Sequence, residues 1–331
     1  MSKIGTFRSL GSFEVEQKYS RVARIGDRLD ELSAIVDWDD FRTMLEKIHP
    51  ETQGAGRPSY DCVLLFKMSV LQAWFGISDE QLEYQIADRF SFQKFLGYPE
   101  SIPDYSTFWN FREAVSKAAI EKQLLDKLNA QLDAKGLKVK KGVIQDATII
   151  TADVGKKRAA ELKSQANKGQ GVSYTPNQLS HIDLDASSTQ KNGQWSFGYK
   201  AHVKCGANNQ LIRAVEVTTA SVHDSQVHLE KDGDGSVYRD KGYAGTELLA
   251  KDVRDKTLAK GTRGHPLTDR QKKRNGLLSK VRCLGERPFA VIKSVFHAGH
   301  VFVKTTARVT TQVFFRCFGY NIYRARGLLS A

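Results

Sequence analysis

One stretch of eight residues, Val143–Ile150, constrains the fold of this 331-residue chain more than any other. It is apolar and rich in β-branched residues, which predicts a buried strand, and it carries Asp146 in its middle. A lone ionised carboxylate inside such a strand is costly unless it is paired, hydrogen-bonded or bound to a metal, and the strand holds no basic residue. Asp146 is therefore either satisfied by a neighbouring loop or part of a metal site shared with other carboxylates.

Asp240 is a second carboxylate in a setting that suits such a site. It ends a short predicted strand that begins at Gly235, and it stands before a turn that contains Gly242 and Gly245. A carboxylate just past a strand end, beside glycines, is where α/β sheets usually place active groups. Asp also commonly caps turns, so a purely structural role competes with the functional one.

Glu286 is the third carboxylate, and it lies in a basic region that is predicted to be helical. At about 100° per residue, Arg282, Glu286 and Lys293 lie within roughly 40° of one another on a helix. One helix face would then carry an acid between two cations. Pro288 predicts that the helix kinks, or that a new helix begins, near the acid.

The basic excess of the chain lies in its second part. The formal net charge is +13, of which residues 1–140 contribute −2 and residues 141–331 contribute +15. A field this one-sided favours a polyanion such as nucleic acid, although a basic surface can also be solvated decoration. The densest run, residues 254–287, holds eleven Lys or Arg residues, and a capping box of Thr268 and Gln271 predicts a helix there.

The pattern of residues 1–138 predicts helices. Residues 1–55 are expected to form an arm and a helix, and residues 56–138 a helical domain with boundaries at Gly76, Ser78, Gly97, Asp104 and Gly136. Short helices in succession fit a helix-turn-helix DNA reader, and they fit helical packing without a recognition role equally well. The near-neutral charge argues against this segment as the main electrostatic anchor for DNA.

After Ile150 the chain becomes polar, and residues 151–197 are predicted to form a surface insertion that is partly disordered when free. Strand character returns in residues 199–205, where apolar residues alternate with Lys200, His202 and Lys204. This alternation predicts one packed face and one basic face. We interpret His202 as a solvated strand histidine rather than a metal ligand.

The four cysteines are far apart and suggest neither a zinc site nor a disulfide framework, which favours a reducing compartment. No apolar run reaches the roughly 18 to 20 residues that a membrane span needs. We therefore expect a cytoplasmic protein with no membrane partner.

The three acidic motifs resemble the acidic triad of DDE transposases from bacterial insertion sequences, in particular insertion-sequence family five and its relatives. Asp146 stands in Ile-Gln-Asp-Ala-Thr, Asp240 in Asp-Lys-Gly-Tyr, and Glu286 in an Arg-x3-Glu-x6-Lys pattern. Further family motifs follow the same order along the chain, at Gly56-Arg57-Pro58, Ile102–Arg112, Phe197–His202 and Val222–Ser225. The resemblance covers roughly residues 56–324, and its order and spacing make it specific.

The resemblance implies an α/β fold: a ribonuclease H-like mixed-sheet catalytic core at residues 139–327, preceded by an all-α N-terminal domain that binds DNA ends or mediates dimerisation. It implies that the protein acts on double-stranded DNA as a homodimer or larger assembly, in the cytoplasm and nucleoid of a bacterium. It also implies that Asp146, Asp240 and Glu286 are catalytic and hold two Mg²⁺ ions, with Mn²⁺ as an alternative. The expected reaction is strand cleavage at terminal inverted repeats followed by strand transfer.

Basic residues of these motifs and of the basic run are the candidates for contacts to DNA. Arg282 and Lys293 would hold phosphates that flank the cleaved bond. The full set of candidates is Arg57, Arg112, Lys200, His202, Lys241, Lys272, Lys273, Arg274, Arg282 and Lys293.

Two alternatives belong to other classes of protein. One is a nuclease of the same fold that cuts DNA without joining it, and the other is a DNA-binding protein whose catalytic domain is inactive. The intact acids disfavour the second alternative. The chain departs from the family pattern at Ser279, where a Tyr is frequent, and at Arg239, where a small residue is common, and neither departure removes a metal ligand.

Overall fold

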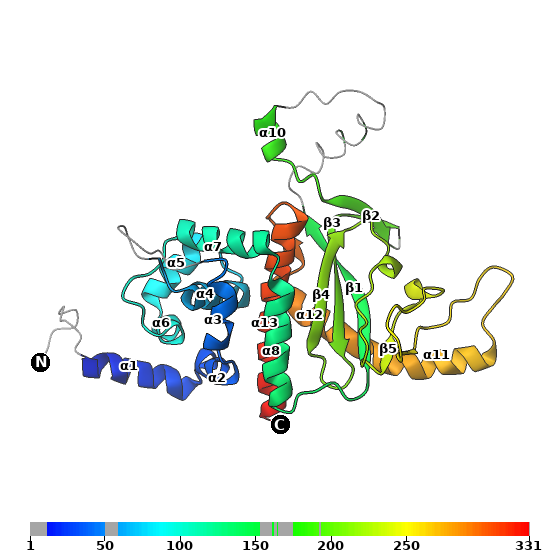
Figure 1. Ribbon diagram of the computed structural model, residues 1–331, viewed down its shortest axis with the longest axis horizontal. Coiled ribbons are helices and arrows are strands. Elements are labelled where there is room, and N and C mark those ends of the chain that lie inside the picture. Colours follow the sequence, from blue (N-terminus) through cyan, green and yellow to red (C-terminus); the bar gives the residue numbers. More distant parts are fainter. Residues whose placement is uncertain are drawn as a thin grey trace, which may run out of the picture.

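The structure, a computed structural model, describes residues 12–49, 59–152, 175–191 and 193–330, together with residues 161 and 164. Helices form its N-terminal part, and a mixed sheet with further helices follows (Figure 1). The helices are α1 (Ser12–Ile25), α2 (Arg28–Ile35), η1 (Asp39–Phe41), α3 (Arg42–Leu45), α4 (Cys62–Phe75), α5 (Asp79–Asp88), α6 (Phe90–Leu96), α7 (Tyr105–Ala118), α8 (Glu121–Ala134), α10 (Pro176–Ser180), η2 (Asp224–Gln226), η3 (Lys241–Tyr243), α11 (Asp269–Arg282), η4 (Cys283–Gly285), α12 (Glu286–Ser294) and α13 (Thr306–Leu329). The strands are β1 (Val143–Ala152), β2 (Ser187–Lys191), β3 (Gln194–Gly206), β4 (Ile212–Thr219), β5 (Ser236–Tyr238), β6 (Arg254–Asp255) and β7 (His300–Val301).

The ends of the N-terminal helices lie where the sequence predicts them. Gly76 and Gly97 end α4 and α6 in the left-handed conformation, with φ of 62° and 86°, which glycine adopts without a steric penalty. Ser78 caps α5 by accepting a hydrogen bond from the Gln81 backbone N–H. Between the predicted boundaries at Asp104 and Gly136 the chain forms two helices, because Ala119 takes a left-handed conformation (φ 50°) between α7 and α8.

The sheet is mixed, and β1 lies near its middle. The strand order is β2-β3-β1-β5-β6, with β4 also paired to β3 and β7 also paired to β1. β3 and β4 run antiparallel to their neighbours, whereas β5 and β7 run parallel to β1. The predicted strand at Val143–Ile150 and the antiparallel strands that follow it are confirmed. β1 and β5 therefore point their carboxyl ends in the same direction.

The C-terminal helix α13 stands between the N-terminal helices and the sheet (Figure 1). Its Phe318 ring lies 5.2 Å from that of Phe66 in α4 and 5.7 Å from that of Phe41, measured between ring centroids. On the sheet side, Asn321 accepts a hydrogen bond from the Ile212 backbone N–H and donates one to its carbonyl. One hydrophobic cluster thus runs from the N-terminal helices through α13 into the sheet. The domain boundary near residue 138 stays a prediction.

The second face of β3 differs from the prediction. His202 is completely buried, and Lys204 is 2% exposed. The chain after β4 folds back over this face, where Gln145 of β1 donates a hydrogen bond to the Val227 carbonyl. The interpretation of His202 as a solvated histidine was therefore wrong, because alternation along a strand does not reveal a loop that covers its polar face.

The polar insertion predicted at residues 151–197 is shorter at both ends. β1 continues to Ala152, and residues 187–191 and 194–206 form the β2-β3 hairpin. Most of the insertion between these strands lies outside the described residues.

Among the described residues, no single helix is long and apolar enough to cross a membrane, although α4 and α5, bent by 103°, pass that test as a pair.

Candidate active site

Asp146 and Asp240 lie in matching positions on neighbouring parallel strands. Val143 and Ile144 of β1 pair with Val237 and Tyr238 of β5, so the residue two places beyond each pair is Asp146 on one strand and Asp240 on the next. The charge of Asp240 acts on the carboxyl of Asp146 and raises its pKa. Asp240 also caps η3 by accepting a hydrogen bond from the Lys241 backbone N–H, so it fills the structural role as well.

Glu286 is brought to β1 by a break in the helix, as Pro288 predicts. α11 ends at Arg282, a short 3-10 turn follows, and α12 begins at Glu286. Gly285 allows this turn to press on the strand, because a Cβ added there would lie 2.6 Å from Ile144 Cγ2. Any larger residue at position 285 would push Glu286 away from the sheet.

Arg282 joins two of the three acids. Its Nη1 lies 3.3 Å from Asp146 Oδ2, and its Nη2 lies 2.7 Å from Glu286 Oε1. Asp146 Oδ1 accepts a further hydrogen bond from the Ala147 backbone N–H at 2.8 Å. The expectation that the strand carboxylate has a partner is confirmed, and that partner comes from a distant helix.

The environment of Asp146 disfavours its charged form. Burial raises the pKa of the Asp146 carboxyl, and the neighbouring charge of Asp240 raises it further, while the Ala147 N–H and Arg282 offset part of this. Asp146 and Asp240 thus act on each other as like charges, and the one guanidinium that pairs with Asp146, that of Arg282, is shared with Glu286. A bound cation would relieve that repulsion.

The donor chemistry fits a hard divalent cation, because carboxylate oxygens are the ligands that Mg²⁺ and Mn²⁺ prefer. Asp146 and Asp240 could hold such an ion together. Glu286 does not join them, because its carboxylate pairs with Arg282, and the described residues contain no group of three potential ligands arranged around one point.

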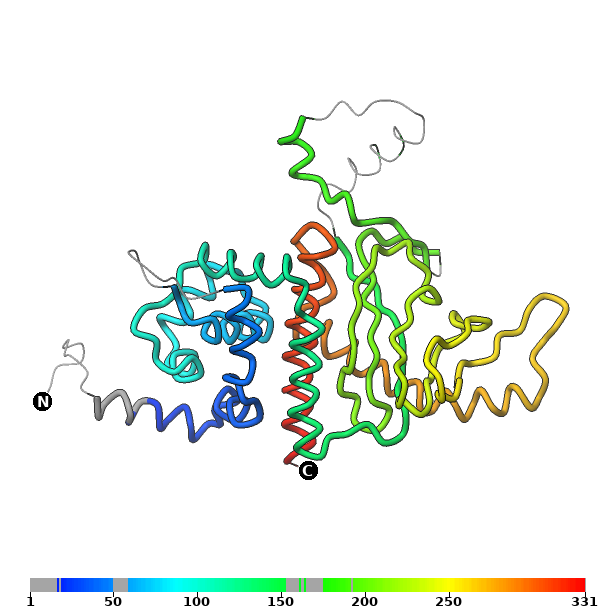
Figure 2. Tube along the Cα trace, in the orientation of Figure 1, coloured from blue at the N-terminus to red at the C-terminus, as the bar shows by residue number. Residues whose placement is uncertain are grey.

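The predicted basic run forms an arm that extends away from the sheet, made of α11 and the chain that leads into it, residues 254–282 (Figures 1 and 2). Thr268 and Gln271 form the predicted capping box. Asn275 joins α11 to the chain that precedes it. Its side chain accepts a hydrogen bond from the Ala259 backbone N–H and donates one to the Ala259 carbonyl, each of 2.9 Å.

Lys272, Lys273 and Arg274 are exposed on the arm, and Lys241 is exposed next to Asp240. Lys272 pairs only with Asp269 on the same helix, and Arg274 donates to the Thr257 carbonyl. These four cations are accessible to a polyanion in the structure as it stands.

Three other candidates for DNA contacts already have partners within the protein. Lys200 donates to the Val222 carbonyl and to Asp224, His202 is buried against Thr218, and Arg112 is bound by Gln72 and Asp79. The prediction that His202 contacts DNA is wrong, because no atom of it reaches the surface. Arg57 lies outside the described residues.

Lys293 lies two turns beyond Glu286 on α12, and a lysine that the sequence analysis missed accompanies it. Burial lowers the pKa of Lys293, and the charge of Lys191 at the end of β2 lowers it further. The same Lys191 acts on the Asp146 carboxyl. No pattern in the sequence indicates that Lys191 lies near Asp146, because the two are brought together only by the β2-β3 hairpin.

Arg239, one of the two departures from the family pattern, does not face the acids. It is 1% exposed and donates hydrogen bonds to Thr257, Asp255 and the Thr246 carbonyl. These hydrogen bonds hold the first residues of the arm against the end of β5. Ser279 lies half-buried in α11.

The helix-turn-helix hypothesis for α4 and α5 gains little support. Their angle of 103° falls within the range of that motif. However, the sequence of α5 contains four carboxylates and no Lys or Arg, so its charge would repel the DNA backbone.

Two protein-family models match the chain. A transposase domain (DUF772) matches residues 17–114, and a transposase DDE domain matches residues 137–322, which is more than half of the chain. No solved structure matches it. The matches do not separate insertion-sequence family five from its relatives. They confirm, together with the mixed sheet, a ribonuclease H-like α/β core that follows a helical N-terminal region.

Proposed function

Because the chain belongs to the family of insertion-sequence DDE transposases, we propose that it binds the terminal inverted repeats of its element and catalyses strand cleavage and strand transfer there. The observation that carries this proposal is the register of β1 and β5, which, continued two residues past the last paired residues, brings Asp146 beside Asp240. Glu286 lies four residues beyond Arg282 and pairs with it. Asp146 and Asp240 come from neighbouring parallel segments of the sheet, a region where α/β proteins commonly hold their active groups, and Arg282 links Glu286 to Asp146.

Asp146, Asp240 and Glu286 are the residues that would hold two divalent ions. Such ions, when bound, stabilise charge on the attacking and leaving oxygens of a phosphodiester. The register of β1 and β5 supports this role for Asp146 and Asp240, whereas Glu286 would first have to leave Arg282. That exchange frees the guanidinium of Arg282 to bind a phosphate, for which its planar fork of donors is suited.

Double-stranded DNA is the proposed partner, and its backbone would lie along the exposed cations of the arm. Lys241 follows Asp240 directly in the chain, Lys293 lies on the same helix as Glu286, and the charge of Lys191 acts on the Asp146 carboxyl. All three would hold phosphates close to the cleaved bond. Backbone contacts of this kind fix the position of the duplex without reading its sequence. Sequence preference, dimerisation through the N-terminal helices and a place in the bacterial nucleoid belong to the proposal.

The test is a cleavage assay on duplexes that carry the terminal repeats of the element, in Mg²⁺ and in Mn²⁺. We expect Asp146→Asn, Asp240→Asn and Glu286→Gln each to lower the cleavage rate by about a thousandfold or more while binding to the ends stays within a few-fold. Asp252→Asn is the matched control, because Asp252 is an exposed carboxylate of the same region, and it should cleave normally. An Asp146→Asn protein that still cuts would disprove the site.

The same assay separates the alternatives. A transposase gives joined products when a target duplex is present, whereas a nuclease of the same fold gives cut ends alone. A wild-type protein that binds the ends and never cuts them would be the inactive DNA-binding protein.

A further inference from the structure

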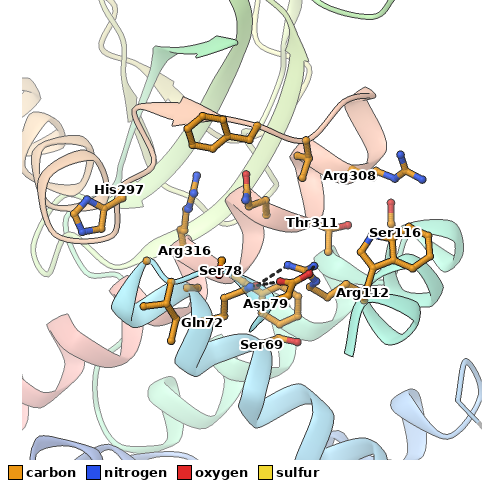
Figure 3. Close-up of a pocket in the computed structure, with 18 of the residues that line it drawn as sticks. Ser69, Gln72, Ser78, Asp79, Arg112, Ser116, His297, Arg308, Thr311 and Arg316 are labelled. Carbon is orange, nitrogen blue, oxygen red and sulfur yellow. Dashed lines mark hydrogen bonds and ion pairs between the residues drawn. The ribbon is translucent and has the colours of Figure 1, made fainter. Parts of the chain in front are cut away.

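A cavity whose lining contains none of the three acids lies where the N-terminal helices meet α12, β7 and α13. It has a volume of about 920 Å³, and its lining comes from α4, α5 and α7 on one side and from residues 293–316 on the other (Figure 3). Segments from the N-terminal and C-terminal parts of the chain thus line the same cavity. The proposed cleavage reaction uses one of its lining residues, Lys293.

The buried acids of this cavity already have partners. Asp79 is bound by Arg112 and Gln72, which the dashed lines of Figure 3 mark. Glu113 receives two hydrogen bonds from Arg308, of 2.6 and 2.9 Å. These two carboxylates are therefore matched to cations within the protein, and the third of the lining, Glu80, is exposed to solvent.

Arg316 of α13 is a charged residue of the lining that lacks such a partner among the described residues. It also lines the cavity, and it is only 9% exposed. Its Nη1 is buried without any hydrogen-bond partner among the described residues, and no carboxylate of that part of the chain pairs with it. Burial lowers the pKa of Arg316 to about 10, so it stays charged at neutral pH. A charged guanidinium held out of water without an anion is costly, and a ligand that supplies the anion would remove that cost.

The rest of the lining indicates what kind of anion fits. The volume is far larger than a free phosphate needs and falls within the range of small-molecule sites. Two aromatic residues of the lining, Phe302 and Trp109, are 81% and 44% exposed. The Arg308 guanidinium lies over the Trp109 ring, whereas Phe302 meets the His300 ring at a steep angle, so Phe302 is the ring with more room for a planar partner. An arginine that binds a phosphate and an aromatic ring that stacks on a base are the two contacts by which proteins hold single nucleotides.

We propose that this cavity is a nucleotide-binding site in which Arg316 binds the phosphate and Phe302 stacks on the base. The nucleotide comes either from solution or from an unpaired end of a DNA strand, and both sources present the same chemistry. The site lies between the N-terminal helices and the catalytic core, so its occupant would join the two.

The experiment is calorimetric titration of the full-length protein, without divalent metal, with AMP, adenosine and inorganic phosphate. We expect AMP to bind at one site, adenosine and phosphate each to bind more weakly, and Arg316→Gln to weaken AMP binding by about tenfold or more. Arg326→Gln is the matched control, because Arg326 is on the same helix, carries the same charge and pairs with Glu31 on the surface outside the cavity. Asp146→Asn should bind AMP as the wild type does, which separates this site from the proposed catalytic acids.

Two further measurements keep the proposal open to refutation if Arg316→Gln folds poorly. Phe302→Ala changes an exposed side chain, and it should weaken AMP several-fold while leaving inorganic phosphate unaffected. Without ligand, the melting temperature of Arg316→Gln should equal or exceed that of the wild type, because an unpaired buried charge has been removed.

AMP that fails to bind, or that binds Arg316→Gln or Phe302→Ala as tightly as the wild type, would overturn the proposal. The source of the nucleotide follows from competition with a duplex that has a three-nucleotide single-stranded tail and with a blunt duplex of the same sequence. Displacement of AMP by the tailed duplex alone identifies a DNA strand end as the occupant, and displacement by neither identifies a free nucleotide.

Discussion

Two sets of charged residues lie on neighbouring strands of the same sheet, and they differ in whether the fold neutralises their charge. The basic set on β3 is enclosed: Lys200 and Lys204 each have a carboxylate of their own, in Asp224 and Asp234, and the loop after β4 covers them. The acidic set, Asp146 within β1 and Asp240 just past the end of β5, is left with excess charge, because Asp146 and Asp240 repel each other.

This difference shows which polar residues are free to act on a substrate. A charge that the fold has neutralised contributes to stability, whereas a charge that the fold leaves uncompensated costs stability and gains its partner from outside. Replacing residues of the two sets should therefore change the free energy of unfolding in opposite directions.

The largest expected effect is at Lys204, whose side chain is 3% exposed and lies 2.9 Å from Asp234. Lys204→Met should lower the free energy of unfolding by about 3 kcal/mol, because it leaves Asp234 as an unpaired carboxylate with little access to water. Urea denaturation measures this loss. Adding Asp234→Asn to the variant should recover part of it, and a double variant less stable than the single one would contradict the enclosed pair.

His202, between the two lysines, should make the protein sensitive to acid. Burial lowers the pKa of His202 to about 4, whereas in the unfolded chain it is about 6.5. The unfolded state therefore binds the proton first, and stability falls as the pH drops from 6.5 towards 4, by up to about 3 kcal/mol from this group. Urea midpoints at pH 7, 5.5 and 4.5 should show a steeper decline for the wild type than for His202→Gln, and parallel declines would refute this assignment.

At the acidic set the sign should reverse. The pKa of Asp146 is raised in the fold, so its charged form destabilises the protein above that pKa, and stability falls as the pH rises through it. Asp146→Asn should therefore raise the free energy of unfolding at pH 7 by about 1 kcal/mol while it abolishes cleavage. Asp224→Asn is the comparison variant, because it removes the partner of Lys200 and should destabilise. Equal decreases in the free energy of unfolding of both variants would show that the two sets do not differ in this way.

The basic arm should show the smallest effect on stability. Replacing Lys272, Lys273 and Arg274 by Gln should change the free energy of unfolding by less than about 0.5 kcal/mol, because these side chains are exposed. If they contact the DNA backbone, the slope of log affinity against log salt should fall by up to about three units on specific and random duplexes alike.

A triple change of Lys117, Lys122 and Lys135 to Gln is the control for the arm, since it alters the same charge on exposed sites of the N-terminal region. It should leave the slope unchanged. An arm variant with an unchanged slope would mean that the arm is merely a solvated helix.

Local features of the fold could be predicted from the sequence because their causes are local. Gly76 and Gly97 end helices through their own backbone freedom, Thr268 caps α11 through its own hydroxyl, and Pro288 starts a helix close to Glu286. The strand around Asp146 was equally clear from its β-branched residues.

What the sequence could not predict depends on contacts between distant segments. The burial of His202 follows from a loop more than fifteen residues later in the chain, and the partner of Asp146 is Arg282, 136 residues away. Lys191 reaches the acids only through a hairpin inside the polar insertion. No periodicity within one segment reports such encounters.

The central position of α13 has a consequence for how the protein is made. The apolar surface of α4 is complete only when α13, which follows it by more than 200 residues in the chain, has packed against it. At roughly 5 to 20 residues per second, a ribosome needs on the order of 10 to 50 seconds to pass from one helix to the other. During that interval the nascent chain exposes Phe66 and its neighbours, so a transcript cut short before α13 would yield an aggregation-prone fragment rather than a working DNA-binding half.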